Sequence, residues 1–205
     1  MGLSLALVAA ALAVALALRP WRRLRADGAL HPWLASLVLL PWLWAAQRVM
    51  PGGMQLQLSG ACLMVLMLGW PLAVLSLLPI AITGALLGGI GWPQALDQLA
   101  WHGMAAATLA LGIGLATRRW LPHHPFVFIL GRGFFTTALA IMAAGTLAAL
   151  VHPLPEGTDL VTLLVGHWLM AWGEAFSTGM LVAIFVAFKP QWLATWSDSR
   201  YLPKD

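Results

Sequence analysis

Charged residues are scarce in this sequence: they make up 9% of its 205 residues, whereas 61% are hydrophobic. A chain with so little polar surface cannot coat a water-soluble globule of this size. The basic residues form no run with interleaved polar side chains, so the net charge of +4 does not indicate a nucleic-acid partner. The composition therefore predicts an integral membrane protein that is surrounded by the lipid bilayer.

Cysteine and nucleotide-binding motifs are also lacking. Cys62 is the single cysteine, which excludes an intramolecular disulfide and a metal cage built from cysteines. The sequence has no Walker motif and no glycine-rich phosphate loop after a strand, so any use of ATP requires another chain. No serine or cysteine has a base at an interpretable spacing and no pair of carboxylates is evident, so the protein is not expected to be an enzyme.

Long apolar runs are what the chain has instead. They cover approximately residues 2–18, 32–46, 58–91, 99–117, 126–151 and 160–188. The run 58–91 is too long for one span and contains Pro71 and Pro79, so we expect two short or broken spans that separate near one of these prolines. The sequence thus predicts an all-α bundle of about seven transmembrane helices over residues 1–188, followed by a cytoplasmic interfacial tail over residues 189–205.

The basic residues indicate the orientation of this bundle. Positive charge follows the first apolar run rather than preceding it, which predicts an uncleaved span with the N-terminus outside. With seven spans, Asp97, Glu156 and Asp159 lie outside and most basic residues lie inside, as the positive-inside rule requires. The basic residues assigned to the inside are Arg19, Arg22, Arg23, Arg25, Arg118, Arg119, Lys189, Arg200 and Lys204. The C-terminus is therefore expected in the cytoplasm.

Two glycines, Gly84 and Gly88, lie four residues apart in an apolar run. This spacing puts them on one face of a helix, where the absence of side chains lets another helix approach closely. The pattern predicts a close helix crossing but no particular function.

The run from Leu160 to Phe188 carries the most informative polar residue. Glu174 lies near its middle, and His167, Ala171 and Thr178 fall on the same side of the helix. A carboxylate at that depth costs roughly 3 kcal/mol unless it faces protein, a partner or water, so it is a candidate for a functional site. The alternative is a protonated or paired glutamate that only holds helices together.

Two histidines are predicted near the outer end of the same bundle. His102 and His167 each lie about one or two turns below the outer surface, with Glu174 deeper. Imidazoles and a carboxylate that converge on an outward-opening cavity are ligand types that suit nickel or cobalt. No His-x-x-x-His pair occurs, however, and each histidine could instead form hydrogen bonds between helices.

Arg132 is predicted inside a membrane span, about one and a half to two turns from its cytoplasmic end. Its long side chain could extend to the inner interface, where the guanidinium would meet water. The alternative is an ion pair with Glu174, which would neutralise both groups and compete with a metal for the carboxylate. The sequence leaves both alternatives open.

Several short strings between about Met54 and Leu202 resemble a known family. They are residues 57–61 (Gln-Leu-Ser-Gly-Ala), 67–71 (Met-Leu-Gly-Trp-Pro), 131–135 (Gly-Arg-Gly-Phe-Phe), 174–180 (Glu-Ala-Phe-Ser-Thr-Gly-Met), 189–196 (Lys-Pro-Gln-Trp-Leu-Ala-Thr-Trp) and 200–202 (Arg-Tyr-Leu). They resemble a proteobacterial branch of the CbiM-like family. Members of that family are the substrate-specific membrane components of energy-coupling factor transporters for cobalt and nickel.

The resemblance implies a bundle of about seven helices in the bacterial plasma membrane that captures a divalent cation outside and passes it inward. A transmembrane coupling protein and two ATPases would be its partners. No permanently bound cofactor is implied, because the metal ion would be the cargo. The face formed by Ala9, Ala13 and Ala17 would suit contact with the coupling protein, although alanine-rich spans are common.

The chain departs from the family at two expected ligands. Better-known members begin Met-His, whereas this chain begins Met1-Gly2, and they have a histidine where this chain has Gln57. A glutamine oxygen is a harder and weaker ligand for nickel or cobalt than an imidazole. The expected metal site is therefore rebuilt from Glu174, His167, His102 and Gln57, with Arg132 and Thr178 as further intramembrane polar groups. The rival hypothesis is a non-transporting membrane scaffold or assembly protein that keeps the fold without the metal.

Overall fold

A computed structural model of the chain describes residues 1–21, 29–46, 48–49, 55–56, 58–154 and 157–201. The α-helices are α1 (Gly2–Ala17), α3 (Leu30–Ala45), α4 (Ala61–Leu68), α5 (Trp70–Gly88), α6 (Trp92–Gln98), α7 (Ala106–Trp120), α8 (Thr136–Val151), α9 (Leu160–Phe188) and α10 (Asp198–Tyr201). Two π-helical segments, η1 (Leu99–Ala105) and η2 (Val127–Phe135), lead directly into α7 and α8, and a 3₁₀ turn, η3 (Pro190–Trp192), follows α9. A two-residue antiparallel ladder joins β1 (Arg48–Val49) to β2 (Gln55–Leu56). The predicted all-helical class is therefore confirmed.

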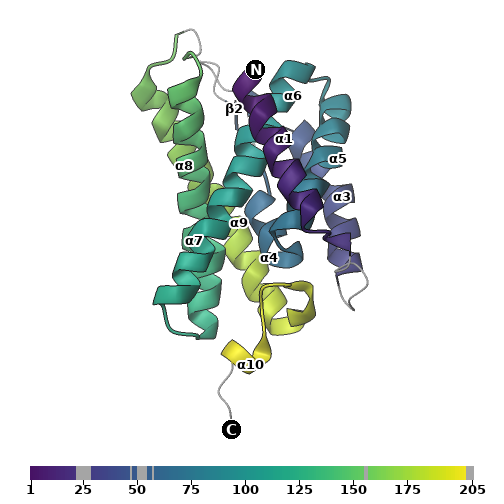
Figure 1. The fold of residues 1–205 in the computed structure, drawn as a ribbon. Helices are drawn as coiled ribbons and strands as arrows, with labels where there is room; N and C mark the ends of the chain where they lie inside the picture. The colour runs from purple at the N-terminus through teal and green to yellow at the C-terminus, as the bar shows by residue number, and fades with distance from the viewer. Residues whose placement is uncertain (22–28, 47, 50–54, 57, 155–156, 202–205) are drawn as a thin grey trace.

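Four helical stretches of the described chain are long and apolar enough to cross a membrane. They are Trp70–Gly88, Trp92–Trp120, Val127–Val151 and Leu160–Phe188. The apolar helices α1 and α3 have 16 residues each, which corresponds to about 24 Å of helix and falls short of a hydrocarbon core of about 30 Å. Figure 1 shows the long helices side by side, with the N-terminus at one end of the bundle and α10 at the other.

The long apolar run 58–91 breaks as expected near its first proline. Helix α4 ends at Leu68, Gly69 adopts a φ of 79°, and α5 begins at Trp70 with Pro71 in its first turn. Gly69 permits this backbone conformation, which strains residues with a Cβ atom. The other proline, Pro79, lies inside α5. Helix α4 is consequently an eight-residue element, and all of its residues except Leu63 are buried.

The close helix crossing predicted from Gly84 and Gly88 is confirmed between α5 and α3. A Cβ added at Gly84 would lie 2.8 Å from the Cβ of Trp44. A Cβ added at Gly88 would lie 3.2 Å from the Cα of Ala45. Trp44 is buried at this crossing and donates its indole N–H to the carbonyl of Ser59 at 3.0 Å. The two glycines thus bring α3 within reach of the segment that leads into α4.

The first turn of α9 is capped by Asp159, whose carboxylate accepts hydrogen bonds from the hydroxyl and the backbone N–H of Thr162. Because both bonds favour the charged form, they lower the pKa of the Asp159 carboxyl from its ordinary value. The capping contribution is therefore complete above the ordinary aspartate pKa of about 3.9 and is lost as the pH falls through the lowered value.

We expect Asp159→Ala to accelerate hydrogen exchange of the amides in the first turn of α9 at neutral pH, because the capping oxygens are removed. Asp159→Asn keeps one capping oxygen and should change this exchange much less. Hydrogen exchange measured by mass spectrometry compares the three proteins. Equal exchange in all of them would show that the cap does not protect this turn.

Candidate functional site

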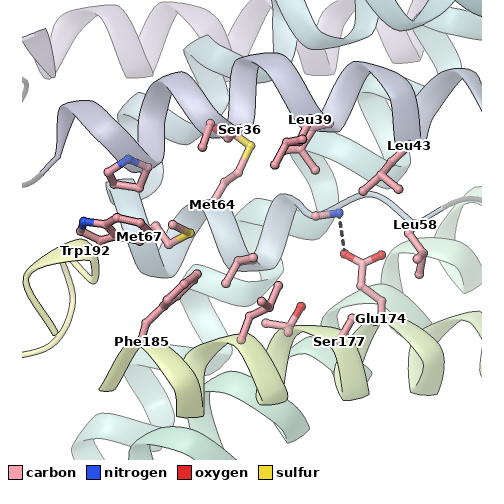
Figure 2. A pocket seen from close by; sticks show the side chains of 17 residues that line it. Ser36, Leu39, Leu43, Leu58, Met64, Met67, Glu174, Ser177, Phe185 and Trp192 are labelled. Carbon is pink, nitrogen blue, oxygen red and sulfur yellow. Dashed lines mark hydrogen bonds between the residues drawn. The ribbon is translucent and has the colours of Figure 1, made fainter. Parts of the chain in front are cut away.

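The carboxylate of Glu174 lies inside the bundle and binds the segment just before α4. One oxygen, Oε2, accepts the backbone N–H of Ser59 at 2.9 Å. The other, Oε1, accepts the hydroxyl of Ser59 at 2.7 Å and the backbone N–H of Gly60 at 3.0 Å. The Glu174 side chain is 3% exposed. Figure 2 shows this carboxylate directed from α9 toward the start of α4.

These bonds satisfy donors that would otherwise be buried without a partner. The first N–H groups of a helix have no acceptor within the helix, and α4 begins in the interior of the protein. A negative charge is also favourable next to a helix N-terminus, where the helix dipole is positive. Ser59 adds a further bond, because its hydroxyl oxygen accepts the N–H of Ala61 at 3.1 Å. Glu174 and Ser59 together cap the start of α4.

The opposite end of α4 is capped by the chain that follows α9. The backbone N–H of Ala194 donates to the carbonyl of Met67 at 3.0 Å. The backbone N–H and the hydroxyl of Thr195 both donate to the carbonyl of Leu66, at 3.2 and 3.0 Å. The carbonyls at the end of a helix also lack N–H donors within it. The segment expected as an interfacial tail therefore closes back onto α4, and both ends of the short helix are held by α9 and its continuation.

Arg132 contacts this same C-terminal segment rather than Glu174. Its Nη1 donates to the carbonyl of Thr195 at 3.3 Å and to the hydroxyl of Tyr201 at 3.4 Å. Its guanidinium carbon lies 5.2 Å from the ring centre of Phe128, within the range of a cation–π contact. Of the two alternatives left open by the sequence, the ion pair with Glu174 is absent between these two described side chains.

His102 and His167 meet between η1 and α9. Their ring centres are 6.3 Å apart and their planes are tilted by 58°. Gly145 of α8 leaves the space for His167, since a Cβ at that position would lie 2.7 Å from the Cγ of His167. The Nδ1 atoms of both histidines are buried and have no hydrogen-bond partner within the described chain. This is unusual, because most buried polar atoms in proteins are hydrogen-bonded.

Both His102 and Arg132 lie in π-helical segments, η1 and η2 respectively. A π-helix inserts one extra residue per turn and changes the direction of the side chains around it. Such segments occur frequently at functional sites. The apolar periodicity of the sequence did not reveal them, because hydropathy does not distinguish an α-helical from a π-helical turn.

The predicted ligands are thus only partly brought together. His102 and His167 lie close to each other, whereas Glu174 is seven residues beyond His167, about 10 Å along the helix. Gln57 lies outside the described residues. Among the residues that the structure does describe, no three histidine, cysteine, aspartate or glutamate side chains are grouped closely enough to hold a metal ion. Thr178 lies one turn beyond Glu174 and is also buried.

A cavity of about 300 Å³ lies beside Glu174, between α3, α4 and α9 (Figure 2). Its volume is at the lower end of the range for sites that hold small molecules. Most of its wall is apolar, and the polar side chains are Glu174, Ser36, Ser177 and Thr178. Because Glu174 is already bonded to Ser59 and Gly60, the cavity offers mainly apolar surface to a bound group.

Sequence reasoning missed Ser59 as the partner of Glu174. A signal was available, since a serine followed by a glycine at the start of an apolar run is typical of the residues that precede a helix. That signal could have located the start of α4. It could not have identified the acceptor, because Ser59 and Glu174 are 115 residues apart in the chain.

A second polar cluster lies at the end of the bundle that contains the N-terminus. The hydroxyl of Ser4 donates to Oδ1 of Asp97 at 2.5 Å, and Nε2 of His152 lies 3.6 Å from the same oxygen. Asp97, which the sequence places outside the membrane, thus lies beside His152 in the structure. This cluster joins α1, α6 and the residue that follows α8.

The site therefore consists of a capped buried helix, a pair of imidazoles and a mainly apolar cavity, carried by an all-helical bundle with four candidate membrane spans. No family model, curated protein or solved structure matches the chain.

Proposed function

We propose that this chain is a multi-pass protein of the bacterial plasma membrane and the substrate-binding component of an energy-coupling factor transporter for a transition-metal ion, nickel or cobalt. In this proposal the chain crosses the membrane about seven times, with the N-terminus outside and the C-terminus in the cytoplasm. The four candidate spans support a protein that crosses the membrane several times. The distribution of basic residues supports the proposed number of crossings and their orientation. The transmembrane coupling protein and the ATPases implied by the family resemblance would supply the energy.

The observation that carries the metal assignment is the pair of half-buried imidazoles of His102 and His167, whose Nδ1 atoms are buried. Neutral imidazole nitrogens are common ligands of divalent transition metals. With metal–nitrogen distances of about 2.0–2.1 Å, two histidine rings that share an ion lie about 5 Å apart between centres in a tetrahedral site, and about 6.4 Å apart when their nitrogens bind on opposite sides of the ion. The rings of His102 and His167, at 6.3 Å, are close to the value for opposite sides, and the Nδ1 atom of each has no hydrogen-bond partner among the described residues. A metal ion bound between the two rings would give these nitrogens a partner.

Glu174 has a different place in this proposal. Its oxygens accept three hydrogen bonds, which occupy most of the roughly four lone-pair positions of a carboxylate. In this proposal Glu174 therefore fixes the position of α4 and is not a ligand of the metal. Its carboxylate contributes only a negative electrostatic potential to the metal site. The amide oxygen of Gln57, two residues before Ser59, is the remaining candidate ligand from the sequence.

Isothermal titration of the detergent-solubilised protein with nickel and with cobalt tests the metal assignment. We expect binding by the wild type, and affinity at least about tenfold weaker for His102→Ala and for His167→Ala, because each removes a ligand. His31→Ala, which changes an exposed histidine on α3, is the matched control and should bind as the wild type does. Heats for the wild type that equal those of the His102→Ala, His167→Ala double variant would exclude this metal site.

The second candidate is a non-transporting membrane scaffold, and the capping role of Glu174 favours it. A carboxylate that accepts three hydrogen bonds at the start of α4 has an architectural role whether or not an ion is bound. The two functions differ in their partners, because a transporter component must copurify with a coupling protein and ATPases. Metal uptake by cells that express the chain with and without the coupling protein and ATPases of an energy-coupling factor transporter separates them. ATPase-dependent uptake supports transport, and its absence together with normal folding supports the scaffold.

A further inference from the structure

The guanidinium of Arg132 is a buried cation without an anion. It is 8% exposed, and the described residues place no carboxylate within ion-pair distance of it. Its Nη1 bonds are long and both acceptors, a carbonyl and a phenol, are neutral. Its Nε is buried and has no hydrogen-bond partner in the described part of the chain. A buried charge of this kind is costly unless an anion or water completes its environment.

A small cavity adjoins Arg132 and has the chemistry of an anion site. Its volume is about 10 Å³, close to the space that one water molecule or one oxygen atom occupies. Arg118, His123 and Tyr201 contribute to its wall together with Arg132, and none of the described residues that line it is acidic. One oxygen of a larger anion could enter beside Arg132 while its other oxygens remain at the exposed side chains of Arg118 and His123.

The surroundings of this cavity resemble the edge of a membrane. It lies at the junction of α7 and η2, where Trp120 and Phe126 are 78% and 68% exposed. Exposed aromatic rings next to arginines are typical of the level of the lipid headgroups. Figure 1 shows this junction at the end of the bundle that also carries α10, opposite the N-terminus. A phosphate at this level would therefore be within reach of both the bilayer and the adjoining solution.

We propose that Arg132, with Arg118 and His123, binds a phosphate group, carried by an anionic phospholipid or free in solution. One phosphate oxygen occupies the small cavity and accepts a hydrogen bond from Nε of Arg132, and a guanidinium is well suited to such a bond. The bound phosphate thereby neutralises the charge that holds Thr195 and Tyr201. Because these residues belong to the segment that caps α4, the phosphate stabilises the docking of the C-terminal segment.

The thermal stability of the full chain in nanodiscs tests this site. Intrinsic tryptophan fluorescence gives the Tm in phosphatidylcholine alone and in phosphatidylcholine with phosphatidylglycerol in equal parts. We expect phosphatidylglycerol to raise the Tm of the wild type by about 3 °C or more, because a ligand bound only by the folded state stabilises it. Arg132→Met, which keeps the apolar stem, should lose this rise, and Arg118→Gln should reduce it.

Arg19→Gln is the matched control, since Arg19 is an exposed arginine that does not line the cavity. It should retain the full rise. If Arg132→Met does not fold, the rise in Tm is compared between Arg118→Gln and Arg19→Gln instead. Native mass spectrometry should then detect bound phosphatidylglycerol on the wild type and less of it on Arg118→Gln. An equal rise in all variants would mean a general effect of charge on the bilayer and would overturn the site.

A second arm uses detergent-solubilised protein and inorganic phosphate. A rise in Tm with phosphate that depends on Arg132 or Arg118 identifies a soluble phosphate as the source, whereas a rise confined to phosphatidylglycerol nanodiscs identifies the lipid. No rise in either arm contradicts the proposal. None of these measurements involves nickel or cobalt, so their failure is separate from failure of the metal assignment.

Discussion

Replacing Glu174 by alanine is expected to lower the free energy of unfolding by roughly 3–5 kcal/mol, since it removes the acceptor of three buried hydrogen bonds. Two of the donors are backbone N–H groups that cannot move to another acceptor without displacing the start of α4. Hydrogen bonds to a charged group contribute more than neutral ones, and each unsatisfied buried donor carries its full cost of desolvation. Loss of this one side chain should therefore release α4 from α9.

Thermal unfolding in detergent, followed by tryptophan fluorescence and far-ultraviolet circular dichroism, measures this effect. Ser177→Ala is the matched control, because Ser177 lines the same cavity and, within the described chain, donates its hydroxyl to the carbonyl of Gly173 in its own helix. It should change the stability by less than about 0.5 kcal/mol. Glu174→Gln, which keeps one oxygen, should fall between the two. Equal stability of Glu174→Ala and Ser177→Ala would refute the capping role.

Gly84→Leu is expected to destabilise the protein by roughly 3 kcal/mol or more, since the position has no space for a side chain. A Cβ there would already lie 2.8 Å from the Cβ of Trp44 and 3.3 Å from the carbonyl oxygen of Pro41. The nearest atoms belong to the backbone and to the stem of a buried tryptophan, so they cannot rotate away. We expect α3 to separate from α5 and the indole of Trp44 to lose its hydrogen bond to Ser59.

Gly112→Leu, at a second helical glycine, is expected not to destabilise the protein. No atom lies within 4 Å of a Cβ added at Gly112, which is exposed in α7. A leucine there should be neutral or stabilise the protein by up to about 1 kcal/mol, because glycine is a poor helix former. The unfolding midpoint distinguishes the two variants. The close-crossing interpretation predicts opposite signs, and two variants of equal stability would contradict it.

Local patterns predicted a large part of the fold. The absence of charge over long stretches predicted the helices, because apolar periodicity and composition belong to each segment separately. The break before Trp70 and the close approach at Gly84 were also readable, since a proline within an apolar run and two glycines four residues apart limit the backbone and the packing wherever they occur. Glu174 was recognised as exceptional because a carboxylate within an apolar helix must have a partner.

The partners themselves were decided only by the tertiary structure. Hydropathy shows that Glu174 and Arg132 need polar contacts but does not show which ones, because the free energy of pairing depends on distances between segments far apart in the chain. Glu174 bonds to Ser59, which is 115 residues away in the sequence, and Arg132 bonds to Thr195, which is 63 residues away. Glu174 and Arg132 do not contact each other.

The sequence by itself determined that this chain forms apolar helices with a few ionisable groups among them. Only the packing of those helices decided that α4 is short, that Glu174 and the segment around Thr195 hold its two ends, and that His102 faces His167. The physical reason is that helix formation depends on neighbours along the chain, whereas the satisfaction of a buried donor or charge depends on which element lies beside it in space.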